Sequence, residues 1–302
     1  MASTPAAPQA DARPPLDETL YSLEPEDEKL YAEQIGITDP EELKNHILAV
    51  QAEAYAVKPY QCIRRFSFAR MKISKMPAYP QFLKLGRERK GALYLDLGCC
   101  VGNDIRKAIL DGFPVSQAIG ADLHPVFWDV GHKLFKSTPE TFPVKFIPAD
   151  VLDPASLAQT DLPTSVPTEP LDISSLTSLT PLRGRISALH TSAFFHLFSE
   201  EHQYQIAKLI APLLSPEPGS IMFGAHGGLP QKGTRERKNT HGIFMFCHSP
   251  ESWKELWEKQ IFPEGQVRVD AFLKENVRTE FSQTQGDVVT KAYVLVWTIT
   301  RL

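Results

Sequence analysis

The chain has 302 residues, of which 42% are hydrophobic and 10% aromatic, enough to bury a sizeable core and to exclude global disorder. Its 32 basic and 36 acidic residues give a formal net charge of −4, whereas a polyanion-binding surface normally needs a basic excess, so no nucleic acid partner is expected. No apolar stretch approaches the roughly 18 to 20 residues that cross a bilayer, and no secretory signal opens the chain. We therefore expect a soluble cytoplasmic protein with no membrane partner. The sequence leaves the oligomeric state open.

The four cysteines predict neither a disulfide framework nor a metal site. Cys99 and Cys100 are adjacent and poorly suited to pair with each other, and no paired C-x-x-C spacing indicates zinc. Small, soft side chains beside a glycine loop are more often packing residues than redox or metal groups, and we interpret this pair as packing.

The N-terminal third is expected to contain a tail and a helical cap. Residues 1–17 are rich in Pro and Ala, with little to bury, and are predicted to be a disordered tail. Residues 18–90 are predicted to form the cap. A helix over Asp39–Val57 begins with an Asp cap and a Pro in its first turn. Its apolar residues fall on one stripe, which indicates packing against another element: Leu43, Ile47, Val50 and Ala54.

Residues 91–302 are predicted to form one α/β domain, because short apolar runs alternate with helical stretches. This order predicts a parallel sheet with right-handed crossovers. The expected strands are 93–98, 118–123, 144–151, 185–190 and 220–226, and the expected helices are 103–111, 126–135 and 199–214.

Two further segments complete the expected domain. The connection 153–182 is rich in Pro, Ser, Thr and Leu, and we expect a short helix flanked by loops. The apolar runs 267–272 and 288–299 have no helix-length amphipathic segment between them, so they are expected to pair antiparallel at the edge of the sheet.

The strongest local signal is the glycine loop LYLDLGCCVGND, from Leu93 to Asp104. A buried strand ends at Gly98 and a helix opens at Gly102, so the backbone can approach a ligand and offer free N–H groups. A dinucleotide fold needs G-x-G-x-x-G, which is absent, and Asp96 would repel a pyrophosphate. A carboxylate there suits a ligand with an ammonium group, such as S-adenosylmethionine.

Two more carboxylates follow at the ends of the next two strands. Asp122 comes twenty residues after Gly102 and, with the adjacent Leu123, is placed to accept hydrogen bonds from ribose hydroxyls. Asp150 can accept from an adenine amino group while the N–H of Val151 serves a ring nitrogen. Each aspartate could instead simply cap the helix that follows it. All three in this order favour a ligand crevice at the carboxyl ends of parallel strands.

The segments LDLGCCVGND, GADL and PADV resemble the signature of class I S-adenosylmethionine-dependent methyltransferases. The paired Cys99–Cys100, the segment KPYQCIRRFSF beginning at Lys58, and SAFFHLF at 192–198 are more closely similar to fungal methyltransferases of secondary-metabolite clusters. These include the carboxyl-methylating enzymes of the austinol and terretonin meroterpenoid pathways. The resemblance covers about residues 25–300, with one departure: Cys100 replaces the middle glycine of the usual loop.

The resemblance implies a Rossmann-like seven-stranded sheet and O-methylation of a polyketide- or terpenoid-derived small molecule. Tyr60 and Arg64 are expected to close over the cofactor's amino acid end, with Arg64 on its carboxylate, although a solvent-facing arginine is the plain alternative. The full set of predicted cofactor-binding residues is Tyr60, Arg64, Asp96, Gly98, Cys99, Gly102, Asp122, Leu123, Asp150, Val151, His190 and Thr191.

The acceptor is expected to be a small acid or a phenol. A carboxylate is already ionised at neutral pH and needs no base, whereas a phenol with a pKa near 10 needs one. The candidate bases are His190, His196, His226 and His241, and the sequence does not choose between the two cases.

A basic loop at 227–241 is the candidate lid over the acceptor, and its charges would attract an anion unless they simply face water. These charges are Lys232, Arg235, Arg237 and Lys238. Trp253 and His241 are the predicted substrate contacts, although Trp253 and Trp257, four residues apart on a helix, would more usually be core. The rival hypothesis is a methyltransferase fold that binds S-adenosylmethionine without transferring the methyl group.

Overall fold

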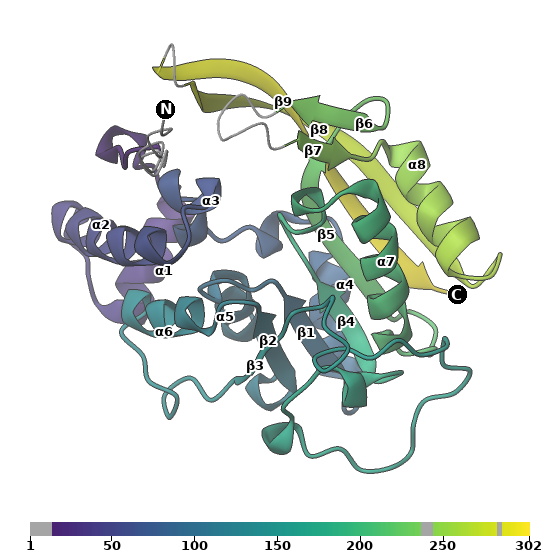
Figure 1. The fold of residues 1–302 in the computed structure, drawn as a ribbon. Coiled ribbons are helices and arrows are strands. Elements are labelled where there is room, and N and C mark those ends of the chain that lie inside the picture. Colours follow the sequence, from purple (N-terminus) through teal and green to yellow (C-terminus); the bar gives the residue numbers. More distant parts are fainter. Residues whose placement is uncertain (1–13, 237–243, 283–285) are drawn as a thin grey trace, which may run out of the picture.

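The computed structural model describes residues 14–236, 244–282 and 286–302. A seven-stranded sheet lies at its centre with the strand order β3-β2-β1-β4-β5-β9-β8 (Figure 1). The strands are β1 Leu93–Leu97, β2 Ala118–Asp122, β3 Lys145–Pro148, β4 Ile186–His190, β5 Ile221–Gly228, β8 Val267–Ser282 and β9 Gly286–Arg301. β1 to β5 are parallel, β9 is antiparallel to β5, and β8 is antiparallel to β9. The predicted Rossmann-like sheet and its antiparallel edge pair are confirmed.

Alternation along the strands gives the sheet two apolar faces, and helices cover both. Leu93, Leu95 and Leu97 of β1 share a core with the helices on one side, while Tyr94 belongs to the core on the other. The first side carries α7 Glu200–Ile210 and α8 Pro250–Glu255, which continues as a π-helix over Leu256–Ile261. The second side carries α4 Tyr79–Glu88, α5 Asn103–Leu110 and α6 Pro125–Leu134.

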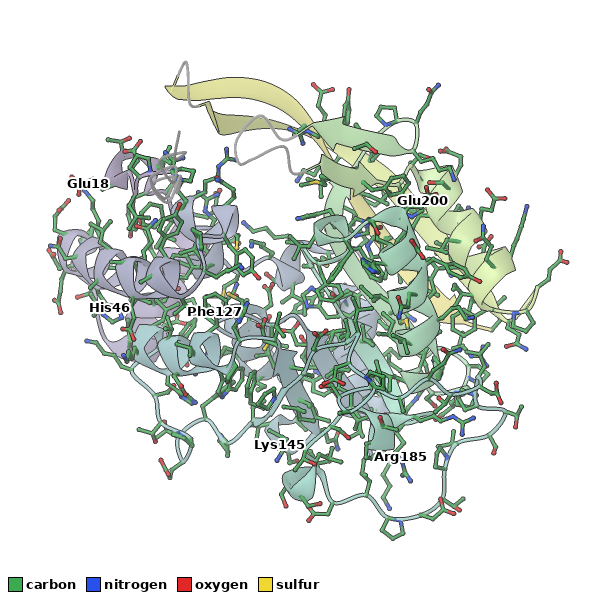
Figure 2. The ribbon with its side chains drawn as sticks, viewed as in Figure 1. Glu18, His46, Phe127, Lys145, Arg185 and Glu200 are labelled. Carbon is green, nitrogen blue, oxygen red and sulfur yellow. The ribbon has the colours of Figure 1, made fainter. Side chains whose placement is uncertain are left out.

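The N-terminal helices α1 Pro25–Ile35, α2 Pro40–Val57 and α3 Gln61–Arg64 form a separate group beside α6 (Figure 1). The helix predicted from Asp39 is confirmed, since the Asp39 side chain accepts from the Glu42 N–H at 2.8 Å. Its apolar stripe packs in one core with Phe127 of α6, and His46 Nε2 lies 2.9 Å from the Leu134 carbonyl (Figure 2). The cap therefore attaches to the sheet domain through α6.

The last residues of the predicted tail contact this cap. Tyr55 Oη donates to the Pro14 carbonyl at 2.7 Å, and Arg64 Nε donates to the Pro15 carbonyl at 2.9 Å. Pro14 is buried. The ordered chain thus reaches back at least to residue 14, and residues 1–13 of the predicted tail lie outside the described residues.

Three segments differ from the sequence-based expectation. Residues 153–182 hold two short 3-10 helices, Ile173–Ser175 and Thr180–Leu182, and bury Leu157, Leu176, Leu179 and Leu182 against the sheet core. Frequent Pro, Ser and Thr prevent a longer helix, so the leucines anchor a loop instead. The expected lid loop begins with the continuation of β5 to Gly228. After β5, the strands β6 Gly233–Glu236 and β7 Phe244–Cys247 pair antiparallel as a hairpin.

The edge strands are also longer than the predicted runs. β8 and β9 each have 16 residues and pair with each other along their whole length. β9 pairs with β5 only over Tyr293–Thr300. The remaining part extends beyond the sheet as a two-stranded ribbon, visible in yellow in Figure 1. Residues 283–285 lie outside the described residues. No helix of the described chain is both long and apolar enough to cross a membrane.

One tight contact joins α6 to the glycine loop. A Cβ placed on Gly131 would come within 2.1 Å of the Val101 carbonyl oxygen, which is backbone and cannot rotate away. Gly131 therefore allows α6 to lie directly on the loop. Since Phe127 of the same helix packs against the N-terminal cap, α6 is the element that relates the cap to the loop.

We expect Gly131→Ala to lower the free energy of unfolding by about 2 kcal/mol, as overpacking in a tight contact does. Helix propensity alone would favour alanine by about 1 kcal/mol, so the sign of the change separates the two effects. Urea denaturation measures it. Gly233→Ala is the matched control, because its Cβ would have nothing within 4 Å. Stabilisation by Gly131→Ala would contradict the close contact.

Candidate functional site

The glycine loop is clamped to the end of β2. The N–H groups of Gly98 and Cys99 both donate to the Ala121 carbonyl, at 2.8 and 3.1 Å. The Asp122 carboxylate accepts from the N–H of Cys100 and of His124, both at 2.9 Å. Three of these bonds hold the turn that leads from β1 to α5 and bring it to Asp122, and the fourth, from His124, fixes the Asp122 carboxylate at the start of α6.

Three residues of this loop have left-handed backbone: Gly98 at φ 72°, Cys100 at φ 51° and Gly102 at φ 71°. Such values suit glycine, so the cysteine at the middle position carries backbone strain. The Cys99 side chain is buried, with its Sγ 3.2 Å from where a Gly120 Cβ would stand. Burial raises the pKa of the Cys99 thiol, which keeps it neutral. Cys99 thus packs beneath the loop, and its N–H and carbonyl both take part in hydrogen bonds of the loop.

Asp96 forms a buried chain of side chains with two residues at the end of β4. His190 Nδ1 donates to Asp96 Oδ1 at 2.7 Å, and Ser192 Oγ lies 2.9 Å from His190 Nε2. The Ser192 oxygen also accepts from the Ala225 N–H at 3.3 Å. Burial raises the pKa of Asp96. Burial opposes charge on His190 too, but the Asp96 carboxylate and its hydrogen bond raise the pKa of the imidazole. His190 thus holds the Asp96 carboxylate through Nδ1, and its Nε2 contacts Ser192.

The other two aspartates differ in exposure. Asp122 is half-buried beside the exposed Leu123, and burial raises its pKa. Asp150 is exposed two residues beyond β3 and accepts from the Leu152 N–H at 2.9 Å, next to the buried Val151. Asp122 also accepts from the N–H of His124, the N-cap residue of α6, so it supports the start of that helix. The described side-chain bond of Asp150 is to a loop N–H.

The segment before the sheet contains two predicted cofactor-binding residues, Tyr60 and Arg64. The Tyr60 ring lies 6.4 Å from that of His124 and 5.9 Å from that of Phe127, and burial followed by the charge of Asp122 raises the pKa of Tyr60 to about 12. Arg64 is buried and directs its Nε to the Pro15 carbonyl, towards the N-terminal residues. Tyr60 thus lies beside Asp122 and the start of α6, whereas the described contact of Arg64 is with the N-terminal residues.

Lys72 is a site residue that the sequence reasoning missed. The Asp104 carboxylate accepts from the N–H groups of Lys72 and Ile73, at 2.7 and 2.9 Å, and so fixes this turn over α5. Burial raises the pKa of Cys100, and the positive charge of Lys72 acts against this rise; burial and then the same charge also oppose the rise in the pKa of His190 that Asp96 causes. Its positive charge thus acts on the glycine loop at Cys100 and on His190 at the end of β4. No carboxylate in the described part of the chain forms an ion pair with it.

The candidate bases are held in internal hydrogen bonds. His196 Nδ1 accepts from the Gly227 N–H at 2.9 Å, and His226 Nδ1 accepts from Trp297 Nε1 at 3.0 Å. An Nδ1 that accepts carries no proton, so both rings are neutral with the proton on Nε2. Burial lowers the pKa of His226 to about 3. His241 lies outside the described residues.

Trp253, a predicted substrate contact, belongs to the core. It is fully buried, and its ring packs at 4.8 Å from that of His226, 4.9 Å from Phe195 and 5.2 Å from Trp297. Trp257 is likewise buried. The four-residue spacing of Trp253 and Trp257 therefore packs α8 and the π-helix that continues it against the sheet. Both tryptophan rings are buried in the core and are not exposed to an acceptor.

The predicted basic lid is only partly described. Lys232 Nζ forms an ion pair with Glu200 Oε1 at 2.9 Å, on the outer end of α7 (Figure 2). Both side chains are about half exposed, so the pair contributes little to stability. Arg235 lies in β6, while Arg237 and Lys238 lie outside the described residues. The charge of Lys232 is thus compensated locally.

Thr191, at the end of β4, leaves one polar atom for a ligand. Its N–H donates to the Phe223 carbonyl at 3.1 Å, but its buried Oγ1 has no hydrogen-bond partner among the described residues. A buried hydroxyl without a partner is costly in a native structure and often marks an unfilled contact. Thr191 follows His190 directly and lies beside Phe223 and Gly224 of β5.

Comparisons with known proteins identify the family of the chain. A family model described as the meroterpenoid methyltransferase N-terminal domain matches residues 16–69. The O-methyltransferase phiE of Fungal sp. (strain ATCC 74256) is 33% identical over 220 residues, which are 73% of this chain and 66% of phiE. The asnovolin E/chermesin D methyltransferase nvfJ of Aspergillus novofumigatus is 31% identical over 264 residues, 86% of this chain and 83% of nvfJ. The chain belongs to the meroterpenoid methyltransferase family.

Membership of this family makes the chain an S-adenosylmethionine-dependent methyltransferase with the class I fold. A solved methyltransferase of Anabaena variabilis superposes with a TM-score of 0.45 at 14% identity, over 76% of this chain and 86% of that one. The expected family, cofactor and type of activity are confirmed by the family membership.

The residues present fit S-adenosylmethionine. The left-handed residues Gly98, Cys100 and Gly102 shape the turn beside Asp122, Asp122 offers a carboxylate to paired hydroxyls, and the Thr191 hydroxyl lacks a partner among the described residues. Asp96 and Lys72 bring opposite charges to the region that would receive a zwitterionic amino acid. Within the described residues, no group of three His, Cys, Asp or Glu side chains could hold a metal ion.

The neutral, buried His226 generates a prediction about acid stability. Its pKa of about 3 lies below the 6.5 of an unfolded histidine, so between these values the unfolded chain binds a proton that the folded chain does not. Stability is therefore lost as the pH falls from 7 to 5, by about 2 kcal/mol for this residue. We expect His226→Gln, which keeps an acceptor for Trp297 Nε1, to lose less.

Urea denaturation of both proteins at pH 5 and pH 7 measures the difference. Burial also lowers the pKa of His248, to about 4, but this histidine is present in both proteins and cancels. Equal pH dependence of the two proteins would show that His226 is not held neutral.

Proposed function

We propose that the chain methylates a carboxylate oxygen of a small, largely apolar acid. The observation that carries the proposal is the state of the histidines. His196 and His226 are neutral acceptors at Nδ1, and His190 is enclosed between Asp96 and Ser192. None of the three described candidates offers a free basic nitrogen to an acceptor. An acceptor that is already ionised needs none.

The reaction then depends on placement and on exclusion of water. When bound, S-adenosylmethionine supplies the methyl group and leaves as a neutral thioether. The acceptor oxygen forms the new O–C bond as the S–C bond breaks, and the negative charge of the carboxylate and the positive charge of the sulfonium cancel. Holding two such partners at near-attack distance supplies most of the rate enhancement that the protein can provide. The name of phiE, an O-methyltransferase, supports an oxygen acceptor.

We assign the cofactor's parts to residues along the edge of the sheet. Asp122 accepts from the ribose hydroxyls, and Asp150 with the Val151 N–H serves the adenine. Asp96 accepts from the ammonium group, with His190 fixing the orientation of its carboxylate. Lys72 replaces the predicted Arg64 as the partner of the cofactor carboxylate, since the described contact of Arg64 is with Pro15.

We expect Lys72→Met to weaken S-adenosylhomocysteine binding about 10- to 100-fold, the loss of one charge-assisted hydrogen bond. Binding of 5′-methylthioadenosine, which lacks the amino acid end, should remain unchanged. Titration calorimetry measures both. Lys75→Met is the control, because Lys75 is exposed in the same segment. Equal losses for the two ligands, or no loss for either, would exclude this role of Lys72.

A hydroxyl acceptor is the second candidate, favoured by one observation. Ser192 Oγ, His190 Nε2 and Asp96 Oδ1 form a continuous path of hydrogen bonds that could carry a proton inward from an acceptor hydroxyl. Ser192 is the half-buried outer member of this chain and would touch the acceptor, whereas His190 would act through it.

Proton release distinguishes these possibilities. Methylation of a carboxylate releases no proton, whereas methylation of a hydroxyl releases one per methyl group. We expect no proton release from a free-acid acceptor, measured with a pH indicator in weak buffer alongside S-adenosylhomocysteine formation, and kcat/KM independent of pH between about 6 and 9. One proton per turnover would overturn the carboxylate proposal. Cofactor binding without turnover on acids or phenols would favour a binding protein.

A further inference from the structure

The loop after β4 places an aromatic ring directly over the glycine loop. Ala193 has left-handed backbone at φ 54°, unusual for a residue with a Cβ, and its N–H donates to the Ala225 carbonyl at 2.7 Å. The next residue, Phe194, lies so close to Gly98 that a Cβ on the glycine would be 2.9 Å from the Phe194 Cδ2 atom. The strained turn thus holds this ring against the loop.

Phe194 is supported by neighbouring rings but is not enclosed. Its ring centroid lies 5.7 Å from that of Phe195, edge-on, and 5.1 Å from that of Phe198. The side chain is half-buried, whereas Phe195 is fully buried. Part of the Phe194 ring is therefore left for a ligand on the glycine loop.

The site as proposed above determines which atom that ligand presents. The sulfonium of S-adenosylmethionine lies between its ribose and its amino acid end. With the ribose on Asp122 and the amino acid on Asp96 and Lys72, the sulfonium falls above the turn at Gly98, next to Phe194. Aromatic faces attract cations that carry methyl groups, because the negative ring face meets a diffuse positive charge.

We propose that Phe194 recognises the positive charge of the sulfonium and so makes the enzyme prefer S-adenosylmethionine over S-adenosylhomocysteine. The two ligands differ at this atom by one methyl group and one charge. A ring that acts only as an apolar wall contacts both ligands equally. A ring that contacts the charge loses its attraction once the methyl group has left, which favours release of the product. This inference rests on the proposed arrangement of the cofactor.

The test is the ratio of two dissociation constants, measured by calorimetry without an acceptor so that no turnover occurs. We expect Phe194→Leu to weaken S-adenosylmethionine binding on the order of tenfold more than S-adenosylhomocysteine binding. Phe194→Tyr keeps an aromatic face and should restore the wild-type ratio. Phe198→Leu is the matched control, since it removes a ring from the same cluster one step further from Gly98, and should leave the ratio unchanged.

If Phe194→Leu weakened the binding of both ligands equally, the ratio of the two dissociation constants would not change. The ring would then make only apolar contacts, and the inference would be overturned. Tighter binding of both ligands would overturn it too, because the ring would then obstruct the site. Thermal unfolding checks that each variant is folded. If the wild-type protein bound neither ligand, the cofactor arrangement itself would fail, which is distinguishable from a change in the ratio.

Discussion

The site depends on the attachment of the glycine loop to β2. Ala121 supplies one carbonyl and Asp122 one carboxylate, and together they accept four N–H groups from the loop and the start of α6. Without these acceptors the loop would have to satisfy its buried N–H groups elsewhere, and the left-handed residues would lose their constraint. The same carboxylate then has to serve a ligand. Structural and binding roles are therefore combined in one side chain.

Charge in the site is distributed so that each buried group has a defined partner. Asp96 is stabilised by His190, and Asp104 by two backbone N–H groups, so neither carboxylate is buried without compensation. Lys72 differs, because no carboxylate of the described chain pairs with it. Lys72, without a carboxylate partner in the described chain, lies in the same region as Asp96 and Asp104, whose charges are stabilised. This arrangement favours a ligand that carries both charges.

The sequence predicted the elements well where local chemistry specifies them. Asp39 followed by Pro40 marks a helix start, and alternating apolar runs mark the strands, because capping and side-chain periodicity act over a few residues. The spacing of Gly98, Asp122 and Asp150 predicted that they lie at one edge of the sheet, and the structure bonds the glycine loop to Asp122 there. These features need no knowledge of distant contacts.

Other features depend on contacts that no local pattern records. Arg64 reaches the Pro15 carbonyl across 49 positions, and Lys72 owes its place to Asp104, 32 positions away. The core role of Trp253 follows from β5 and β9, which enclose it. The hairpin of β6 and β7 was not predicted either, because Gly233–Glu236 lacks the apolar alternation of a strand.

The position of α6 has a consequence for exchanging parts between members of the family. One face of this helix completes the core of the N-terminal cap, and its glycine lies on the Val101 carbonyl. A chimera that takes residues 16–69 from a relative would inherit half of an interface whose other half remains behind. The natural unit for recombination is therefore the cap together with α6, although more than fifty residues separate them in the chain.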